Sequence, residues 1–301
     1  MADPAPKSSA SAPNPIAIFD RHALRRHRAR AVALDGDAGF LFHEGAERLL
    51  DRLSDIKRPF TRALDLDSRD LLIAERLRAT GIETTVAGEN GPLTVDLEAL
   101  PFAPASFDLV TSSLAFHWIN DLPGALLQLR HILKPDGLLL INLFAGETLE
   151  ALRVALLEAE SEVENGASPR ISPFADPRDL AGLLQRAGFA LPVVDSDRIT
   201  VDYPDAWKLM RDLRAMGETN ATALRHRHFT RRATMLRAAE IYRARFGDEQ
   251  GRIPAEFEIA TLTAWAPHET QPRALRPGSA ATRLANALGT EEHPAGDKAT
   301  P

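Results

Sequence analysis

The sequence predicts an α/β fold in which helices cover both faces of a mainly parallel sheet. Short apolar runs, such as residues 62–67 and 107–113, alternate with longer segments whose apolar residues recur at helical spacing. The connections between these segments are brief, which favours a compact sheet joined by crossover helices. Runs that are apolar along their whole length are typical of strands buried on both faces.

The first half of the chain contains most of the predicted sheet. The helix after the first strand is predicted to end at Gly81, and the turn KPDG (134–137) is predicted to place its glycine at a positive φ. In chain order, the predicted elements are the strand RALDLD, the helix LLIAERLRATG, the strands ETTVAG and GPLTVDL, the buried strand FDLVTSS, the helix LPGALLQLRHIL and the strand LLLINLF.

After Phe144 the pattern becomes mainly helical. An amphipathic helix ETLEALRVALLEAESEV is followed by a helix that ends at Gly188, and VVDSDRITVDY predicts a strand, a turn and a second strand. Residues 205–247 are predicted to be almost wholly helical, and a last strand follows at 257–267. A sheet interrupted late by a helical insertion is the simplest assembly of these parts.

The composition excludes several classes of function. The 301 residues carry a formal net charge of −6, so no general field would attract nucleic acid. Cysteine is absent, which excludes disulfides, thiolate metal sites and a cysteine nucleophile. No apolar run approaches the roughly 18 residues that a membrane-spanning helix needs.

The ends of the chain differ in composition from the part between them. Residues 1–15 are predicted to be a disordered leader that lacks the apolar centre of a secretory signal, so we expect a cytoplasmic protein. Residues 16–287 are predicted to form a single domain, and residues 288–301 a polar, disordered tail.

Specific motifs resemble a known family. The stretch LPF…FDLV…LAFHWIND…LKPDG, with LDLDSRDLL before it, resembles the class I S-adenosylmethionine (SAM) methyltransferases, whose fold is a seven-stranded Rossmann-like sheet. Within that superfamily the chain is similar to the branch of the biotin-pathway malonyl-carrier-protein methyltransferases and the complex I assembly factor five family. Segments such as IFDRHALRRHRARA and YPDAWKLMRDLRAMGETNA extend the resemblance over about residues 16–280. The resemblance implies SAM as the cofactor.

The loop that the resemblance assigns to SAM departs from the family pattern LDLGxGxG. The three glycine positions hold Asp67, Arg69 and Leu71 in this chain. Glycines let the backbone turn tightly and approach the ligand, so each replacement adds a side chain where contact is closest. The resemblance nevertheless assigns Asp65, Asp67, Ser68 and Arg69 to the cofactor, with Ser68 and Arg69 as new donors.

The resemblance also implies the rest of the cofactor pocket. Family members end the second strand with an acid that binds the ribose hydroxyls, and Glu83 and Glu89 are the candidates here. Asp96 corresponds to the acid that hydrogen-bonds the adenine amino group, or else is a solvent-facing loop residue. The other predicted cofactor-binding residues are Leu97, Ser113, Leu114, His117 and Trp118, of which the last two are alternatively a packed structural pair.

An N-terminal helix and the late insertion supply the candidates on the substrate side. Residues 22–30 concentrate several cations, either as the solvated face of a helix or, as in the family, as a lid over the pocket. As part of a lid, Asp20 and Arg21 would lie nearest the ligand. The insertion contributes Arg211, Arg214 and Asn220 as substrate-side candidates.

No motif assigns a metal or a catalytic residue. His226 and His228 lie two residues apart, so they would point to different faces of a helix, and no HExxH motif is present. We therefore expect no metal site, and the catalytic residue stays unassigned.

Three functions remain open. The resemblance implies an assembly factor that hydroxylates an arginine of a protein subunit of respiratory complex I. The alternatives are a SAM-dependent methyltransferase of a small-molecule or carrier-protein carboxyl group, and an inactive assembly chaperone that has lost SAM binding. A fold is shared by proteins with many functions, so the site has to decide among them.

Overall fold

A computed structural model describes residues 17–34, 38–89, 91–272, 286 and 289–290. The chain divides into a compact unit, Met1–Pro267, and a second unit, His268–Pro301. The fold and the site described below belong to the first unit. The predicted leader and most of the predicted tail lie outside the described residues.

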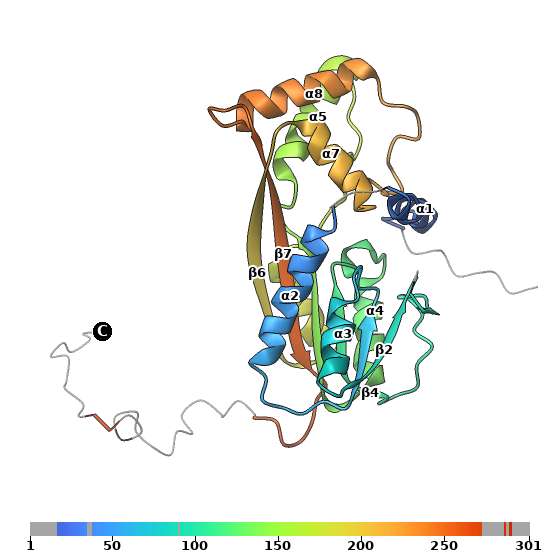
Figure 1. The fold of residues 1–301 in the computed structure, drawn as a ribbon, viewed down its shortest axis with the longest axis vertical. Helices are drawn as coiled ribbons and strands as arrows, with labels where there is room; N and C mark the ends of the chain where they lie inside the picture. The colour runs from blue at the N-terminus through green and yellow to red at the C-terminus, as the bar shows by residue number, and fades with distance from the viewer. Residues whose placement is uncertain (1–16, 35–37, 90, 273–285, 287–288, 291–301) are drawn as a thin grey trace, which may run out of the picture. The chain divides into compact units, whose positions relative to one another are not determined.

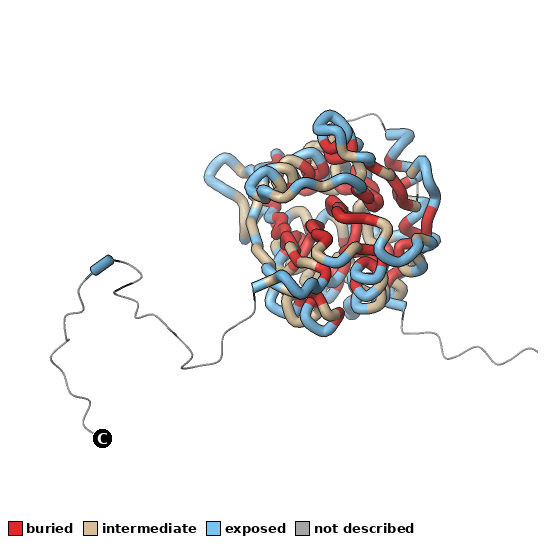
Figure 2. Tube along the Cα trace, turned by 90° about the horizontal axis from the view of Figure 1, so that it is seen from below, coloured by how far each residue is buried: buried red, intermediate tan, exposed pale blue. Residues whose placement is uncertain are grey.

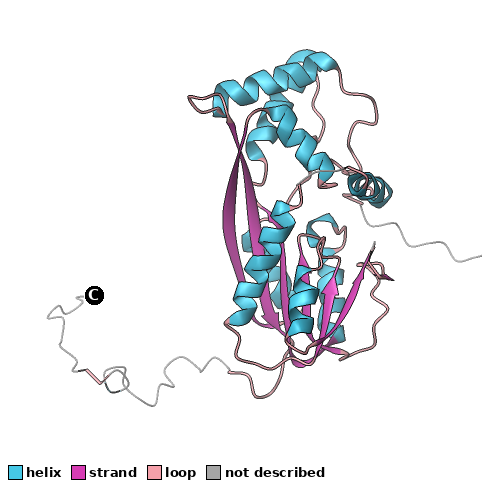
Figure 3. Cartoon of the chain, viewed as in Figure 1, coloured by secondary structure: helices cyan, strands magenta, loops and turns pink. Residues whose placement is uncertain are grey.

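The centre of the first unit is a seven-stranded sheet with the order β3-β2-β1-β4-β5-β7-β6 (Figure 3). Neighbouring strands are parallel from β3 to β5, whereas β7 runs antiparallel to both β5 and β6. The strands are β1 (Arg62–Leu66), β2 (Glu83–Gly88), β3 (Leu93–Thr94), β4 (Phe107–Ser113), β5 (Leu133–Ala145), β6 (Ala190–Tyr203) and β7 (Ile253–Trp265). This confirms the predicted Rossmann-like fold class.

Two pairs of helices cover the sheet (Figure 1). On one face, α2 (Phe40–Ser54) and α3 (Leu72–Ala79) pack through Leu49 and Ile73 onto β1, β4 and β5. On the other face, α4 (Leu122–Ile132) and α6 (Pro177–Arg186) pack through leucines at helical spacing. Burial on both faces explains why the strands are apolar along their length.

A helical cap, formed by α5 (Glu150–Glu164), α7 (Ala206–Ala215) and α8 (Arg232–Phe246), shares a second core with the ends of β5, β6 and β7. The largest fully buried side chains of this shared core are Tyr242, Phe144 and Phe257. Figure 2 shows buried segments in the interior of the unit and exposed ones around it. No described helix is long and apolar enough to cross a membrane.

Three local predictions were wrong. VVDSDRITVDY lies within one continuous strand, because β6 pairs with β7 along its length and its acids face outward, where Asp195 pairs with Arg52. The segment between α7 and α8 is not helical. In the KPDG turn the positive φ, 62°, belongs to Asp136, while Gly137 is needed because a Cβ there would lie 2.8 Å from the Lys134 carbonyl oxygen.

Candidate cofactor site and the helix that closes it

The candidate site lies at the carboxyl ends of β1, β2 and β4. The sheet order changes direction between β1 and β4, and ligands of open α/β sheets bind at such a switch point. The loop after β1, the residues after β2 and the short helix η1 (Phe116–Trp118) meet here. The helix α1 (Arg21–Val32) approaches the same place and is seen end-on beside α7 in Figure 1.

In the loop after β1, Asp67 has the left-handed backbone conformation that glycine adopts most readily. Asp67 has a φ of 53°, in the left-handed region, and its N–H donates to the Ala87 carbonyl oxygen at 2.7 Å. Its Oδ1 accepts from the Glu89 N–H at 3.0 Å. Gly88 makes room for this side chain, because a Cβ there would lie 2.5 Å from the same oxygen.

The other oxygen of Asp67 is bound to α1. Arg28 Nη1 donates to Asp67 Oδ2 at 2.6 Å, and the two side chains are only 3% and 6% exposed. Burial by itself would lower the pKa of Arg28, but the carboxylates of Asp67 and Glu218 raise it above its ordinary value. Both side chains therefore form a buried ion pair at the centre of the site.

Arg69 contacts the end of α7 and the segment that follows it. Its guanidinium pairs with Glu218 at 3.3 Å, donates to the Met216 carbonyl oxygen and lies over the Phe42 ring. Because Arg69 already has these partners, the expected role as a new donor to a cofactor does not match its position. Burial also lowers its pKa.

Glu218 joins both predicted aromatic residues to this network. Its Oε2 accepts from the Trp118 indole at 2.7 Å and lies 3.0 Å from His117 Nε2. Burial would raise the pKa of Glu218, but the charges of His117 and Arg69 hold it below its ordinary value. A buried, ionised carboxylate thus lies between η1 and the loop after β1.

The outer part of the site is closed by a second set of ion pairs. Arg21 donates to Asp96 at 2.6 Å and to Glu89 at 2.9 Å, and Arg25 lies 3.3 Å from Glu89. Arg21, Arg25 and Arg28 recur at i, i+4 and i+7, so they share one face of α1, which we call the arginine face. This face covers the acids that follow β1, β2 and β3, whereas Arg26 and Arg30 on the rest of α1 are exposed. The helix therefore covers the site with one face and is solvated on another.

Asp65 stands beneath the loop and is fully buried. Its Oδ1 accepts from Ser68 Oγ at 2.6 Å and from Thr111 Oγ1 at 2.9 Å, whereas its Oδ2 has no hydrogen-bond partner among the described residues. Burial raises the pKa of Asp65 to about 6, despite these hydrogen bonds. Ser68 also accepts from the Ser113 N–H, so the loop and β4 are joined here.

The space left for a ligand is small. The cavity under the arginine face is about 20 Å³ in volume, and Leu97 and Trp118 are in its wall. That volume holds about one water molecule, whereas small-molecule sites usually measure ~300–1,000 Å³. Asp67 presents a carboxylate where the resemblance places the carboxylate of SAM. In this arrangement the residues do not fit SAM.

The remaining predicted residues have separate places. Asp20 caps α1 by accepting from the Ala23 N–H and pairs with Arg225 at 2.8 Å, so it does not face the cofactor loop. Leu114 is buried in the core between α2 and the cap. Asn220 donates to the Pro169 carbonyl oxygen. Asn220 and Arg214 line a cavity beside the site, and Arg211 is exposed outside it.

Sequence reasoning missed two central residues. In the sequence, Arg28 was recognised only as one of several cations in residues 22–30, and Glu218 was not considered. The i, i+4, i+7 spacing of the arginines was the available signal for Arg28. Of the two ribose candidates, Glu89 lies at the predicted position directly after β2, whereas Glu83 begins that strand at its opposite end.

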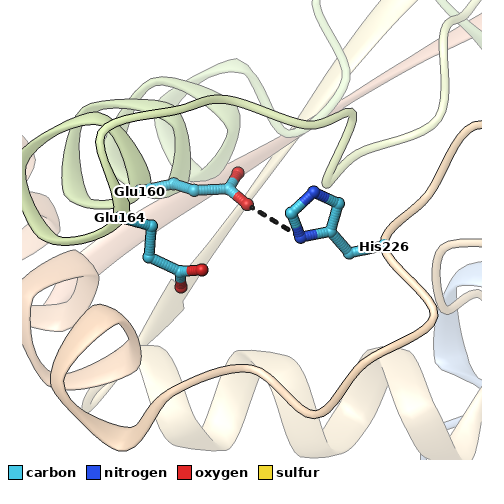
Figure 4. Close-up of side chains that lie close together, drawn as sticks. All are labelled: Glu160, Glu164 and His226. Carbon is cyan, nitrogen blue, oxygen red and sulfur yellow. Dashed lines mark ion pairs between the residues drawn. The ribbon is translucent and has the colours of Figure 1, made fainter.

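A cluster of residues of the types that bind metals lies outside this site, and a side chain of the protein already pairs with it. Glu160, Glu164 and His226 have ligand atoms within 4.8 Å of one another (Figure 4). Arg170 pairs with Glu160 at 2.7 Å and lies 3.9 Å from Glu164, and Ser168 also donates to Glu160. The cation at this position is therefore a side chain of the protein itself, and we interpret the group as structural.

Comparisons with known proteins agree with the fold. A family model for a methyltransferase domain matches residues 59–141. A solved structure of a candidate methyltransferase from Bacillus halodurans has a TM-score of 0.50 and 16% identity, and covers 74% of this chain and 99% of that one. At this identity the likeness shows the fold alone.

Curated relatives match over most of the chain. The chain is 41% identical to the "Arginine-hydroxylase NDUFAF5, mitochondrial" of Mus musculus, covering 93% of this chain and 86% of the relative. The human protein of that name is also 41% identical, with 91% and 84% covered. A malonyl-[acyl-carrier protein] O-methyltransferase of Gallionella capsiferriformans is 31% identical, with 87% and 96% covered. The chain therefore belongs to the NDUFAF5 arginine-hydroxylase family and has the class I methyltransferase fold.

Proposed function

We propose that this chain is an assembly factor of respiratory complex I that acts on an arginine side chain of a protein subunit. The observation that carries the proposal is the 41% identity over 93% of the chain to a relative named as an arginine hydroxylase. The match to the carrier-protein methyltransferases is weaker, at 31%. The cap, which borders the buried Glu218, is the part of the fold that would face the protein substrate.

The closed cofactor site supports a role that does not use SAM at the loop 67–71. Methyl transfer requires SAM to be held in position, since positioning supplies much of the acceleration. Here Arg28 and Asp67 form an ion pair with each other, and the cavity beneath α1 is about 20 Å³. We therefore do not propose a methyltransferase activity, although the fold is that of methyltransferases.

Hydroxylation of an arginine would have the following balance. A C–H bond of the side chain becomes C–OH with one oxygen atom of O₂, and the second oxygen atom becomes water by taking two electrons and two protons from an external reductant. The described residues assign neither the oxygen-activating group nor that reductant. A non-catalytic assembly chaperone is the second candidate, and the closed site favours it.

The substrate would be the quinone-proximal iron–sulfur subunit, as the resemblance implies, and we propose that the protein meets it in the cytoplasm. The experiment deletes the gene and restores it on a plasmid. Assembled NADH dehydrogenase is measured in membranes, and the masses of the arginine peptides of that subunit are measured by mass spectrometry.

The outcomes separate the candidates. For an arginine hydroxylase, deletion reduces assembly and removes a one-oxygen mass increase from one arginine, and the plasmid restores both. For a chaperone, assembly falls but the arginine is unmodified even in the parent strain. Normal assembly in the deletion strain would overturn both candidates.

A further inference from the structure

A larger cavity lies beside the closed site, between α1, α5, α7 and residues 218–230; we call it the α1–α7 cleft. Its volume is about 550 Å³, within the range usual for small-molecule sites. Cationic or imidazole side chains dominate its wall, and Glu218 is the acid among the described residues that line it. These basic residues are His27, Arg30, Arg170, Arg214, Arg225 and His226.

Two of these cations have no ion-pair partner in the described part of the chain. Arg170 is neutralised by Glu160 and Arg225 by Asp20. Arg30 and Arg214 have no such acid near them among the described residues. The carboxylate of Glu218 already accepts from Trp118 and pairs with Arg69 and His117, so it does not compensate them.

His27 indicates the sign of the electrostatic field in the cleft. Its ring is one of the lining groups, whereas its Nδ1 atom is buried away from the open space. Burial lowers the pKa of His27, and the charges of Arg225 and Arg30 lower it further, against a backbone hydrogen bond with Thr219 that raises it. The ring therefore lies in a positive field.

The cleft lining also includes apolar side chains from the cap, namely Leu152, Leu156, Met210, Leu213 and Met235. A site lined by both cationic and apolar side chains suits an organic molecule that has both an anionic and an apolar part. A bare inorganic ion would leave the apolar side chains uncovered.

We propose that the α1–α7 cleft binds a small organic anion whose carboxylate or phosphate group pairs with Arg30 and Arg214. Guanidinium groups bind these anions through paired, charge-assisted hydrogen bonds. The arginine side chain of the proposed substrate would be repelled by the same cations, so the ligand is a different molecule. The inference goes beyond the proposed function and does not depend on it.

A simpler explanation assigns both arginines to helix stability. Arg30 and Arg214 lie in the last turns of α1 and α7, where cations interact favourably with the helix dipole. That explanation predicts a loss of stability on substitution but no dependence on an added anion. The two explanations therefore differ in a measurable way.

The experiment titrates the full chain by calorimetry with phenylsuccinate, a dicarboxylate, and with phenyl phosphate, both at constant ionic strength set by sodium chloride. The variants are Arg30→Ala with Arg214→Ala, and Arg214→Gln alone. The matched control is Arg211→Ala, which removes an exposed arginine of the same helix α7 outside the cleft. Circular dichroism first confirms that each variant is folded.

We expect one or both probes to bind, and their ratio distinguishes a carboxylate from a phosphate ligand. The double variant should weaken binding by about tenfold or more, the equivalent of one charge-assisted hydrogen bond, while Arg211→Ala stays near the parent value. If the double variant does not fold, Arg214→Gln is used instead, and it should also weaken binding of the probe. No binding of either probe, or equal loss in Arg211→Ala, overturns the proposal.

Discussion

At the residue scale, Asp67 occupies a position where the family pattern has glycine and retains the backbone conformation of glycine. Aspartate visits the left-handed region more readily than most residues, and the φ of 53° is therefore tolerated. Its carboxylate then provides Arg28 with an anion inside the protein. The ion pair thus takes the place of an interaction with a ligand carboxylate.

Asp67→Gly should expose a latent SAM site. The glycine keeps the φ, and Arg28 loses its partner, which costs about 3–5 kcal/mol of stability for a buried charge. We expect SAM to raise the Tm of this variant but not that of the parent. Adding Arg69→Gly should bring no further gain, because Arg69 faces Glu218.

Calorimetry with SAM on the parent, Asp67→Gly and the double variant measures this effect. If Asp67→Gly is folded and still gains no SAM affinity, the Arg28–Asp67 ion pair is not what closes the site. Asp67→Asn serves as the control, since it removes the charge but keeps a side chain in the loop.

Asp65 makes the stability of the protein depend on pH. Its pKa is about 6 in the fold and 3.8 ordinarily, so the folded state binds more protons between these values. The contribution of Asp65 to stability therefore falls as the pH rises through this range, by about 3 kcal/mol between pH values well below 3.8 and well above 6. Asp65→Asn should be more stable than the parent at pH 7.5 and lose that advantage near pH 4. Urea unfolding at several pH values measures the difference; a constant difference would contradict the assignment.

At the element scale, α1 is held in place by ion pairs and by a small apolar cluster. Ala23 and Leu24 are buried against Phe19, Trp118 and Ala221, and the arginine face contacts acids after three strands. The acid at its N-terminus, Asp20, adds a cap and a pair with Arg225. Sequence patterns indicated a lid or a solvated helix and could not choose, since the choice depends on where β1, β2 and β3 end in space.

Arg21→Gln should loosen α1 without unfolding the sheet. The substitution removes the ion pairs with Glu89 and Asp96 but leaves Arg28 in place. We expect faster amide hydrogen exchange within α1, measured by mass spectrometry. Arg26→Gln is the control, because Arg26 is an exposed residue of the same helix. Equal exchange in both variants would mean that these ion pairs do not hold the lid.

At the scale of the whole molecule, the cap and the sheet share their core. Phe144 of β5 and Phe257 of β7 are at once parts of the sheet and of the core beneath α5, α7 and α8. The cap therefore has no separate core of its own. We infer that the first unit unfolds as one cooperative structure.

Phe257→Ala tests this cooperativity. Removing a buried phenylalanine costs about 3–5 kcal/mol, and the loss should lower the urea midpoint seen by tryptophan fluorescence and by circular dichroism equally. Tryptophans in the site, the cap and the sheet report on all three parts: Trp118, Trp207 and Trp265. Two separate transitions would show that the cap folds independently.

The α/β class, the order of most elements and the family follow from the sequence alone. Periods of two and 3.6 residues are local properties, and motifs such as LKPDG are read along the chain. The residues Asp67 and Arg69 at the glycine positions of the family pattern are also recognised from the sequence. Local patterning failed in β6, where a polar centre suggested a turn although pairing with β7 keeps the strand extended.

What the side chains of Asp67 and Arg69 do in the loop depends on the tertiary structure. Arg28 and Asp67 are 39 residues apart in the sequence, and Glu218 follows the sixth strand, β6. No local sequence pattern could therefore predict that these residues pair. Ion pairs between distant segments depend on which strand ends lie side by side. For the same reason the α1–α7 cleft, which is lined by Arg30 and Arg214 from segments 184 residues apart, became visible only in the fold.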